Sequence, residues 1–145
     1  MSFTLDANIL LFASDETSER RARALELLEQ VASGDELVYL FWPVVMAYLR
    51  IATHPGIFES PLPQADALAN VERLLGLAHV QTAGEHDRFW SSYRRIASEA
   101  DARGNLVSDA HLVALMTENG VTTIWTHDRD FRRFPSIQVR DPFAG

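Results

Sequence analysis

Three aspartates stand where predicted strands end or a predicted helix begins. Asp6 closes the apolar run Phe3–Leu5. Asp128 follows the predicted strand residues 122–126, and Asp109 lies at the start of a predicted helix. Carboxylates that meet at one edge of a sheet repel each other unless protons or cations neutralise them. Without cysteine or a histidine pair, such oxygen ligands favour Mg²⁺ or Mn²⁺ over zinc, and these ions assist phosphodiester hydrolysis.

Each acid also has an ordinary structural explanation. An acid in the first turn stabilises a helix, which accounts for Asp109, and aspartate is common in turns, which accounts for Asp128. The shared sheet edge, rather than any single residue, therefore favours a site.

The composition excludes several classes of chemistry. All 13 basic residues are arginine, so neither a phosphate-binding loop lysine nor a Schiff base is available. The absence of cysteine excludes thiol nucleophiles and disulfide scaffolds. The net charge of −7 means that a nucleic acid would need a local basic patch or metal ions. The length of 145 residues predicts a single domain over 1–145.

Apolar periodicity and turn residues predict alternating strands and helices along the whole chain. Strands are expected at 3–5, 36–41, 78–81, 121–126 and 137–139, and helices at 8–13, 17–31, 44–53, 64–75, 85–100 and 109–118. In the helix 17–31, Ala22, Leu25, Leu28 and Ala32 are expected to face inward, and Ser108 is expected to cap the last helix.

This order predicts an α/β fold, a three-layer α/β/α sandwich around a short central parallel sheet. Functional residues of such folds lie beyond the carboxyl ends of the strands. The longest nonpolar run, 37–49, spans 13 residues and contains Pro43, which is too short for a bilayer helix. No membrane association and a cytoplasmic location are therefore expected.

Three sequence blocks resemble the motifs of PIN-domain nucleases: Leu5-Asp6-Ala7-Asn8-Ile9-Leu10, Val107-Ser108-Asp109-Ala110-His111-Leu112 and Trp125-Thr126-His127-Asp128-Arg129-Asp130-Phe131. The segment Trp42–Ile51 and the overall length resemble the VapC toxins of bacterial toxin–antitoxin pairs. The resemblance extends over nearly the whole chain.

The resemblance implies an endoribonuclease dependent on Mg²⁺, with Mn²⁺ as the alternative. Asp6, Asp109 and Asp128 match the metal-binding and catalytic acids of the family. Asn8 and Thr126 match polar positions that orient these acids. Asp130 is expected to cap its turn rather than to bind metal.

The implied partners are a VapB-type antitoxin and an RNA substrate, with tRNA and rRNA as candidates. Homodimerisation is the usual state of the family. The surface between Trp42 and Phe58 could line a dimer contact or an antitoxin groove.

One expected acid is missing. VapC-like proteins often carry a glutamate three residues before an arginine, and counting back from Arg50 gives Ala47. We therefore expect weaker binding of a second metal ion. The alternative is a catalytically weak PIN-fold module that binds RNA or antitoxin without turnover.

Other residues are weighed against structural explanations. Arg132 and Arg133 follow Asp128 closely and are candidate contacts for RNA phosphates, with ion pairing as the alternative. Neither His111 nor His127 is expected to be catalytic, and Phe89, Trp90 and Tyr93 are expected to pack. A response-regulator receiver domain is disfavoured because it would need a lysine and an early acidic pair, which this sequence lacks. A haloacid-type phosphatase is disfavoured because it would need D-x-D after the first strand, where this sequence has Asp6-Ala7-Asn8.

Overall fold

The strand β1 (Ser2–Leu5) lies in the middle of a parallel sheet. A computed structural model describes residues 1–144, and within them the sheet has five strands in the order β3-β2-β1-β4-β5. The other strands are β2 (Leu37–Phe41), β3 (Val80–Ala83), β4 (Thr123–Trp125) and β5 (Gln138–Arg140). Thr4 pairs with Tyr39 on one side and with Ile124 on the other. The first strand is therefore the centre of the sheet on which the rest is built.

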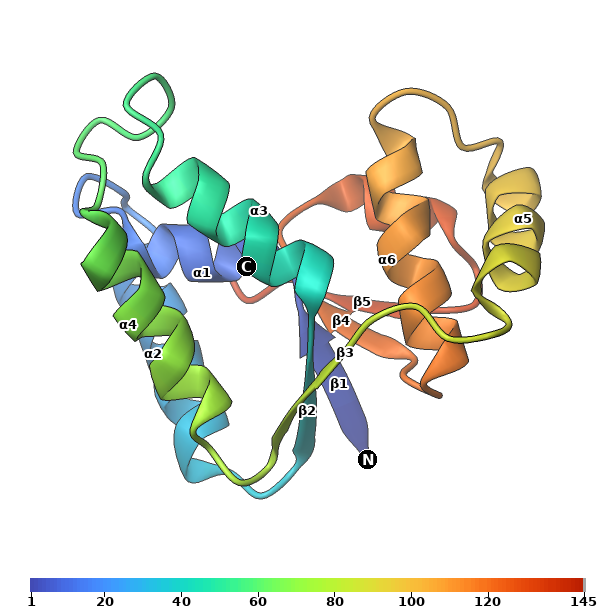
Figure 1. Cartoon of the computed structure of the whole chain (residues 1–145), viewed down its shortest axis with the longest axis horizontal. Coiled ribbons are helices and arrows are strands. Elements are labelled where there is room, and N and C mark those ends of the chain that lie inside the picture. Colours follow the sequence, from blue (N-terminus) through green and yellow to red (C-terminus); the bar gives the residue numbers. More distant parts are fainter. Residues whose placement is uncertain (145) are drawn as a thin grey trace.

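Helices cover both faces of this sheet, which confirms the predicted α/β sandwich. They are α1 (Ala7–Ser14), α2 (Arg21–Ser33), α3 (Trp42–Ala52), α4 (Gln64–Leu75), α5 (Phe89–Ala100) and α6 (Leu106–Glu118), followed by a short 3₁₀ helix, η1 (Arg129–Arg133). Figure 1 shows α5 and α6 on one side of the sheet and α1 to α4 on the other. All strand pairs are parallel, so every crossover returns the chain to the same edge.

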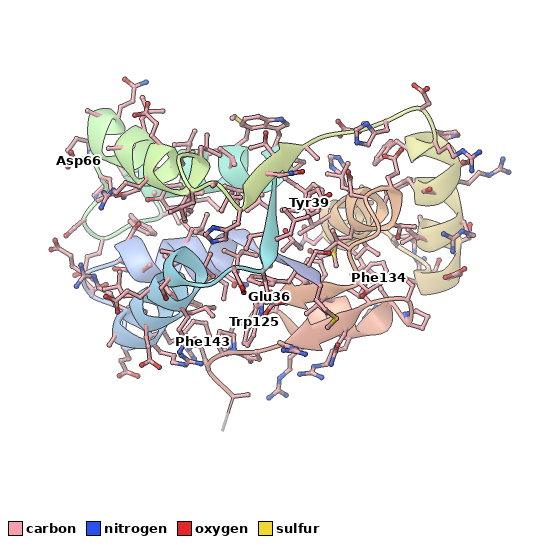
Figure 2. All side chains as sticks on the ribbon, turned by 90° about the horizontal axis from the view of Figure 1, so that it is seen from below. Glu36, Tyr39, Asp66, Trp125, Phe134 and Phe143 are labelled. Atoms are coloured by element: carbon pink, nitrogen blue, oxygen red, sulfur yellow. The ribbon has the colours of Figure 1, made fainter. Side chains whose placement is uncertain are left out.

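The core is densest around α6, where Val113, Ala114, Leu115 and Met116 are all fully buried. A helix that is apolar all round belongs in an interior, and its sequence here fits that position. On the sheet, Ile124 and Phe41 are likewise fully buried. Phe134, labelled in Figure 2, is 2% exposed and belongs to the same core. The burial of α6 fixes the backbone that carries Asp109.

Several element boundaries differ from the sequence prediction. The helix α2 begins at Arg21 rather than Thr17, because Asp15 Oδ1 accepts hydrogen bonds from the backbone N–H and the hydroxyl of Thr17 and holds a turn there. The helix α5 begins four residues later than predicted. The strand predicted at 78–81 is instead β3, shifted by two residues.

The start of α6 and the inward face of α2 were also predicted wrongly. The helix α6 begins at Leu106, which is buried, so Ser108 is inside the helix and does not cap it. The buried residues of α2 are Ala24, Leu27 and Val31 rather than the stripe that contains Leu25. Pro43 does occupy the first turn of α3, as predicted.

Within residues 1–144, no helix combines the length and the apolar character that crossing a membrane requires.

Candidate active site

Asp6 follows β1 directly and begins the next helix. Its backbone is extended, and its Oδ1 accepts a hydrogen bond of 2.7 Å from the backbone N–H of Ala7. Aspartate is a favoured N-cap because its oxygen satisfies an N–H that has no partner inside the helix. The carboxylate is thereby fixed at the carboxyl edge of the sheet.

A hydrogen-bonded network joins Asp6 to the end of β4. The Thr126 hydroxyl, fully buried, donates to Asp6 Oδ2 at 2.8 Å. The Asn8 side-chain amide donates to Thr126 Oγ1 at 3.0 Å and to Asp6 Oδ2 at 3.3 Å. The backbone N–H of Asp128 donates to Thr126 Oγ1 at 3.0 Å. The structure therefore places Asn8 and Thr126 between two of the predicted site acids.

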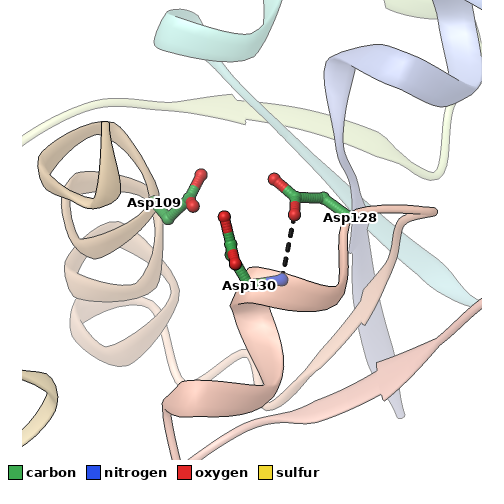
Figure 3. A group of neighbouring side chains, drawn as sticks. All are labelled: Asp109, Asp128 and Asp130. Atoms are coloured by element: carbon green, nitrogen blue, oxygen red, sulfur yellow. Dashed lines mark hydrogen bonds between the residues drawn. The ribbon is translucent and has the colours of Figure 1, made fainter. Parts of the chain in front are cut away.

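Three carboxylates gather beside this network. Asp109 on α6, Asp128 before η1 and Asp130 within η1 each offer an oxygen, and these oxygens lie within 4.8 Å of one another. Figure 3 shows the three side chains directed into one space from two elements. Asp109 and Asp128 are half-buried, and Asp130 is exposed.

The structure assigns the cap of the turn to Asp128, not to Asp130 as expected. Asp128 caps η1, because its Oδ1 accepts a hydrogen bond of 2.9 Å from the backbone N–H of Asp130. The Asp130 carboxylate is left free to join the acidic group. The signal in the sequence was the spacing of two residues between these acids, which a tight turn brings to the same side.

The electrostatics of the group favour a bound proton or cation. Burial, with added repulsion from Asp128, Asp6 and Asp130, raises the pKa of Asp109 to about 7. Burial also raises the pKa of Asp6, with a further contribution from Asp128. Hydrogen bonds from Thr126 and Ala7 oppose this rise in the pKa of Asp6. Asp6 therefore interacts with the other acids through its charge, and the four acids form one electrostatic unit.

The donor set fits a hard divalent cation. Carboxylate oxygens are the ligands that Mg²⁺ and Mn²⁺ prefer, and the group contains neither sulfur nor imidazole. A cation would remove the repulsion that raises the pKa of Asp109. Asp109, Asp128 and Asp130 are therefore the residues that could hold the ion, with Asp6 beside them.

The other residues singled out in the sequence lie on η1, α3 and α5. Arg132 and Arg133 are exposed in the last turn of η1. Ala47 is half-buried in α3, and α3 contributes no carboxylate. Phe89 and Tyr93 pack against the core as expected, whereas Trp90 is 67% exposed and contradicts the packing prediction.

Both histidines near the site are paired with acids. His111 Nε2 lies 2.6 Å from Glu85 Oε1, and His127 Nδ1 lies 2.9 Å from Asp141 Oδ2. These pairs account for the two rings without a role in proton transfer.

Comparison with known proteins agrees with the fold. The sequence matches the PIN domain family over residues 3–137, so the chain belongs to this family. Ribonuclease VapC48 of Mycobacterium tuberculosis is 48% identical over 145 residues, which is the full length of both chains. Ribonuclease VapC43 of the same organism is 33% identical over 141 residues, covering 97% of this chain and 95% of that protein. Within the PIN family, the relatives are therefore VapC proteins.

Solved structures show the same fold at low sequence identity. VapBC-1 from nontypeable Haemophilus influenzae aligns with a TM-score of 0.67 and 17% identity, covering 99% of this chain and all of that chain. VapC20 of Mycobacterium tuberculosis, a toxin that cleaves the sarcin–ricin loop, aligns with a TM-score of 0.65 and 16% identity, covering 94% of this chain and 98% of that chain.

Proposed function

We propose that this chain, as a single PIN domain, is a metal-dependent endoribonuclease that acts in the cytoplasm as the toxin of a type II toxin–antitoxin pair. The observation that carries the proposal is the convergence of Asp109, Asp128 and Asp130 beside the buried Asp6. The VapC relatives, which carry the name ribonuclease at up to 48% identity over the full chain, support RNA as the substrate class.

The residues have separate roles in this proposal. Asp109 and Asp128 hold a divalent ion, Mg²⁺ or Mn²⁺, together with Asp6, and Asp130 supplies a further carboxylate. When bound, the ion supplies an acidic water and a counter-charge for the phosphate oxygens. Asn8 and Thr126 keep the Asp6 carboxylate turned toward the site by their hydrogen bonds. Because the pKa of Asp109 is raised to about 7, this carboxyl is partly protonated near neutral pH and releases its proton when a cation binds.

Asp130 bears on the missing acid at Ala47. With Asp130, and counting Asp6, the group contains four carboxylates. The negative charge needed to bind a divalent ion is therefore present without a glutamate in α3. The position of Asp130 favours turnover over the alternative of a module that binds RNA without cleaving it.

The partners follow from the relatives. Several of the structurally similar proteins were solved as VapBC complexes, which supports a VapB-type antitoxin as the restraint on this chain. Ribosomal RNA and tRNA are the candidate substrates, and the structurally similar VapC20 is a toxin that cleaves the sarcin–ricin loop. Homodimerisation is part of the same proposal, and the exposed Trp42 and Met46 on α3 offer apolar surface for it.

The test is a cleavage assay with antitoxin-free protein on total cellular RNA, run in parallel with Mg²⁺, Mn²⁺ and EDTA. We expect discrete fragments that depend on the metal ion. Asp109→Asn removes a charge from the acidic group while keeping the shape of the side chain, so it should reduce cleavage by at least about 100-fold.

The matched control is Asp101→Asn. This exposed acid pairs with Arg103 outside the site and has a φ of 50°, a conformation that asparagine adopts readily. The Asp101→Asn variant should cleave RNA as fast as the unaltered protein does. If Asp109→Asn cleaves equally fast, the proposed site is wrong. A folded protein that binds RNA but releases no fragments would indicate the binding module instead.

A further inference from the structure

The chain after β5 folds back onto the first two helices. The Pro142 carbonyl accepts a hydrogen bond of 3.0 Å from Arg23 Nε on α2. The Phe143 ring packs edge-on against Phe12 of α1, with 5.1 Å between the ring centres. The backbone N–H of Phe143 donates to Asp141 Oδ1 at 2.9 Å, which closes a tight turn. The segment 141–143 is therefore attached to the body of the protein rather than extended into solvent.

This segment holds the side chain of His127 from several sides. Asp141 Oδ2 lies 2.9 Å from His127 Nδ1, and the Asp141 side chain is only 11% exposed. Phe143 and Phe12 both meet the imidazole edge-on, at 5.5 Å and 5.9 Å between ring centres. A partly shielded carboxylate that accepts a ring N–H fixes both the position of the nitrogen and the orientation of the ring.

His127 lies between the buried Thr126 and Asp128. Its backbone N–H donates to Asn8 Oδ1 at 3.3 Å, and the next N–H, that of Asp128, donates to Thr126 Oγ1 at 3.0 Å. These bonds hold the backbone of residues 127 and 128 directly. The contact with Asp141 holds the same segment through the His127 ring.

We propose that Asp141 is a positioning residue for the site: by fixing His127 it fixes the peptide that carries Asp128. This inference rests on the proposed function, because it assumes that Asp128 helps to hold the ion. A ligand on a short loop loses conformational freedom when an ion binds, and a group that immobilises the loop beforehand removes part of that cost. Groups that orient metal ligands typically change metal affinity or activity by about 10- to 100-fold.

The test measures Mn²⁺ binding to the full chain by calorimetry without RNA. Asp141→Ala should weaken Mn²⁺ binding by about tenfold, the lower end of the range for orienting groups. It should also lower kcat for RNA cleavage while leaving KM for RNA unchanged, because no RNA contact is removed. A residue that served stability alone would lower the melting temperature without moving the Mn²⁺ affinity of the folded protein.

Glu85→Ala is the matched control. It also removes a carboxylate paired with a histidine, and His111 lies two residues from Asp109, but that aspartate is held by a helix rather than a loop. Its Mn²⁺ affinity should stay within about twofold of the unaltered protein.

His127→Phe supplies a second variant, because it keeps an aromatic ring against Phe12 and Phe143 and removes the ring nitrogen that contacts Asp141. It should weaken Mn²⁺ binding to a similar degree, and the double variant with Asp141→Ala should be no weaker than either single variant. If Asp141→Ala does not fold, His127→Phe alone decides.

The outcomes separate the two proposals. If the unaltered protein binds no Mn²⁺ and cleaves no RNA, the proposed function fails. If the unaltered protein binds Mn²⁺ and the folded Asp141→Ala or His127→Phe variant binds it equally well, the positioning role of Asp141 is wrong.

Discussion

Asp109 is the residue whose ionisation depends most clearly on its surroundings. It is half-buried in the first turn of α6, and Asp128, Asp6 and Asp130 add their repulsion to the cost of burial. Its pKa of about 7 in the folded protein compares with 3.8 for an unperturbed aspartate. Between these two pH values the folded state binds more protons than the unfolded state. The free energy of unfolding therefore falls as the pH rises through this window.

Asp109→Asn should remove this dependence, because asparagine stays neutral. Below about pH 4 the variant and the unaltered protein should melt at similar temperatures, whereas at about pH 8 the variant should melt at a higher temperature. Thermal unfolding in EDTA at both pH values measures the difference. Parallel pH profiles for the two proteins would contradict the assigned pKa.

The sequence predicts the positions of single acids at the sheet edge better than it predicts which other side chains they meet there. Asp6 and Asp128 each follow a predicted strand, and the parallel arrangement brings both strand ends to one edge. The contribution of Asp130 depends on the direction of its side chain within η1. That direction follows from the cap that Asp128 forms, a contact that composition and spacing do not specify.

Among the elements, α1, α3 and α4 are joined by one buried hydroxyl. The hydroxyl of Tyr48, a residue that is 2% exposed, lies 2.7 Å from Ser14 Oγ and accepts a hydrogen bond of 3.0 Å from the Asn70 amide. Removing one member of a buried set leaves the others without a partner, and this costs more than the net value of the bond itself.

Tyr48→Phe should therefore lower the free energy of unfolding by about 1–2 kcal/mol, while cleavage by the folded protein should remain unchanged because the site lies elsewhere. Chemical denaturation measures the change. Tyr39→Phe removes the same atom from a strand residue whose ring stacks on Phe41, and it should cost less. An equal loss in both variants would argue against the junction of the three helices.

The elements show where sequence reasoning reaches its limit. The helix α4 was predicted with its observed bounds, because Pro63 precedes it and Gly76 follows it. The helix α2 carries two apolar stripes, and periodicity alone does not say which of them packs inward. The stripe with Leu27 is buried, while Leu25 and Leu28 line a groove beside Leu74 of α4.

For the molecule as a whole, the net charge of −7 opposes RNA binding. Attraction must therefore be local, and Arg132 and Arg133 are exposed on the same short helix as Asp130. Phosphate contacts release counterions, and each one adds about 0.7 to the slope of log affinity against log salt for a single strand.

Replacing both Arg132 and Arg133 by alanine should weaken RNA binding and reduce the salt slope by about 1.4. Binding of Asp109→Asn protein to a short single-stranded RNA, measured at several salt concentrations, shows the effect without cleavage. The control replaces Arg21 and Arg73, which line the groove between α2 and α4 and carry the same total charge. If both double variants bind alike, the two arginines of η1 are not the RNA contact.

The central position of β1 has a consequence for the order of events during translation. Asp6 is made before its hydrogen-bond partner Thr126, which lies 120 positions further along the chain. A ribosome must therefore make and release the chain through Asp130 before the four carboxylates can meet. Shorter nascent chains hold Asp6 without its partners and cannot cut the RNA that surrounds them. A proposed toxin built in this way becomes dangerous only after Asp130 has left the ribosome.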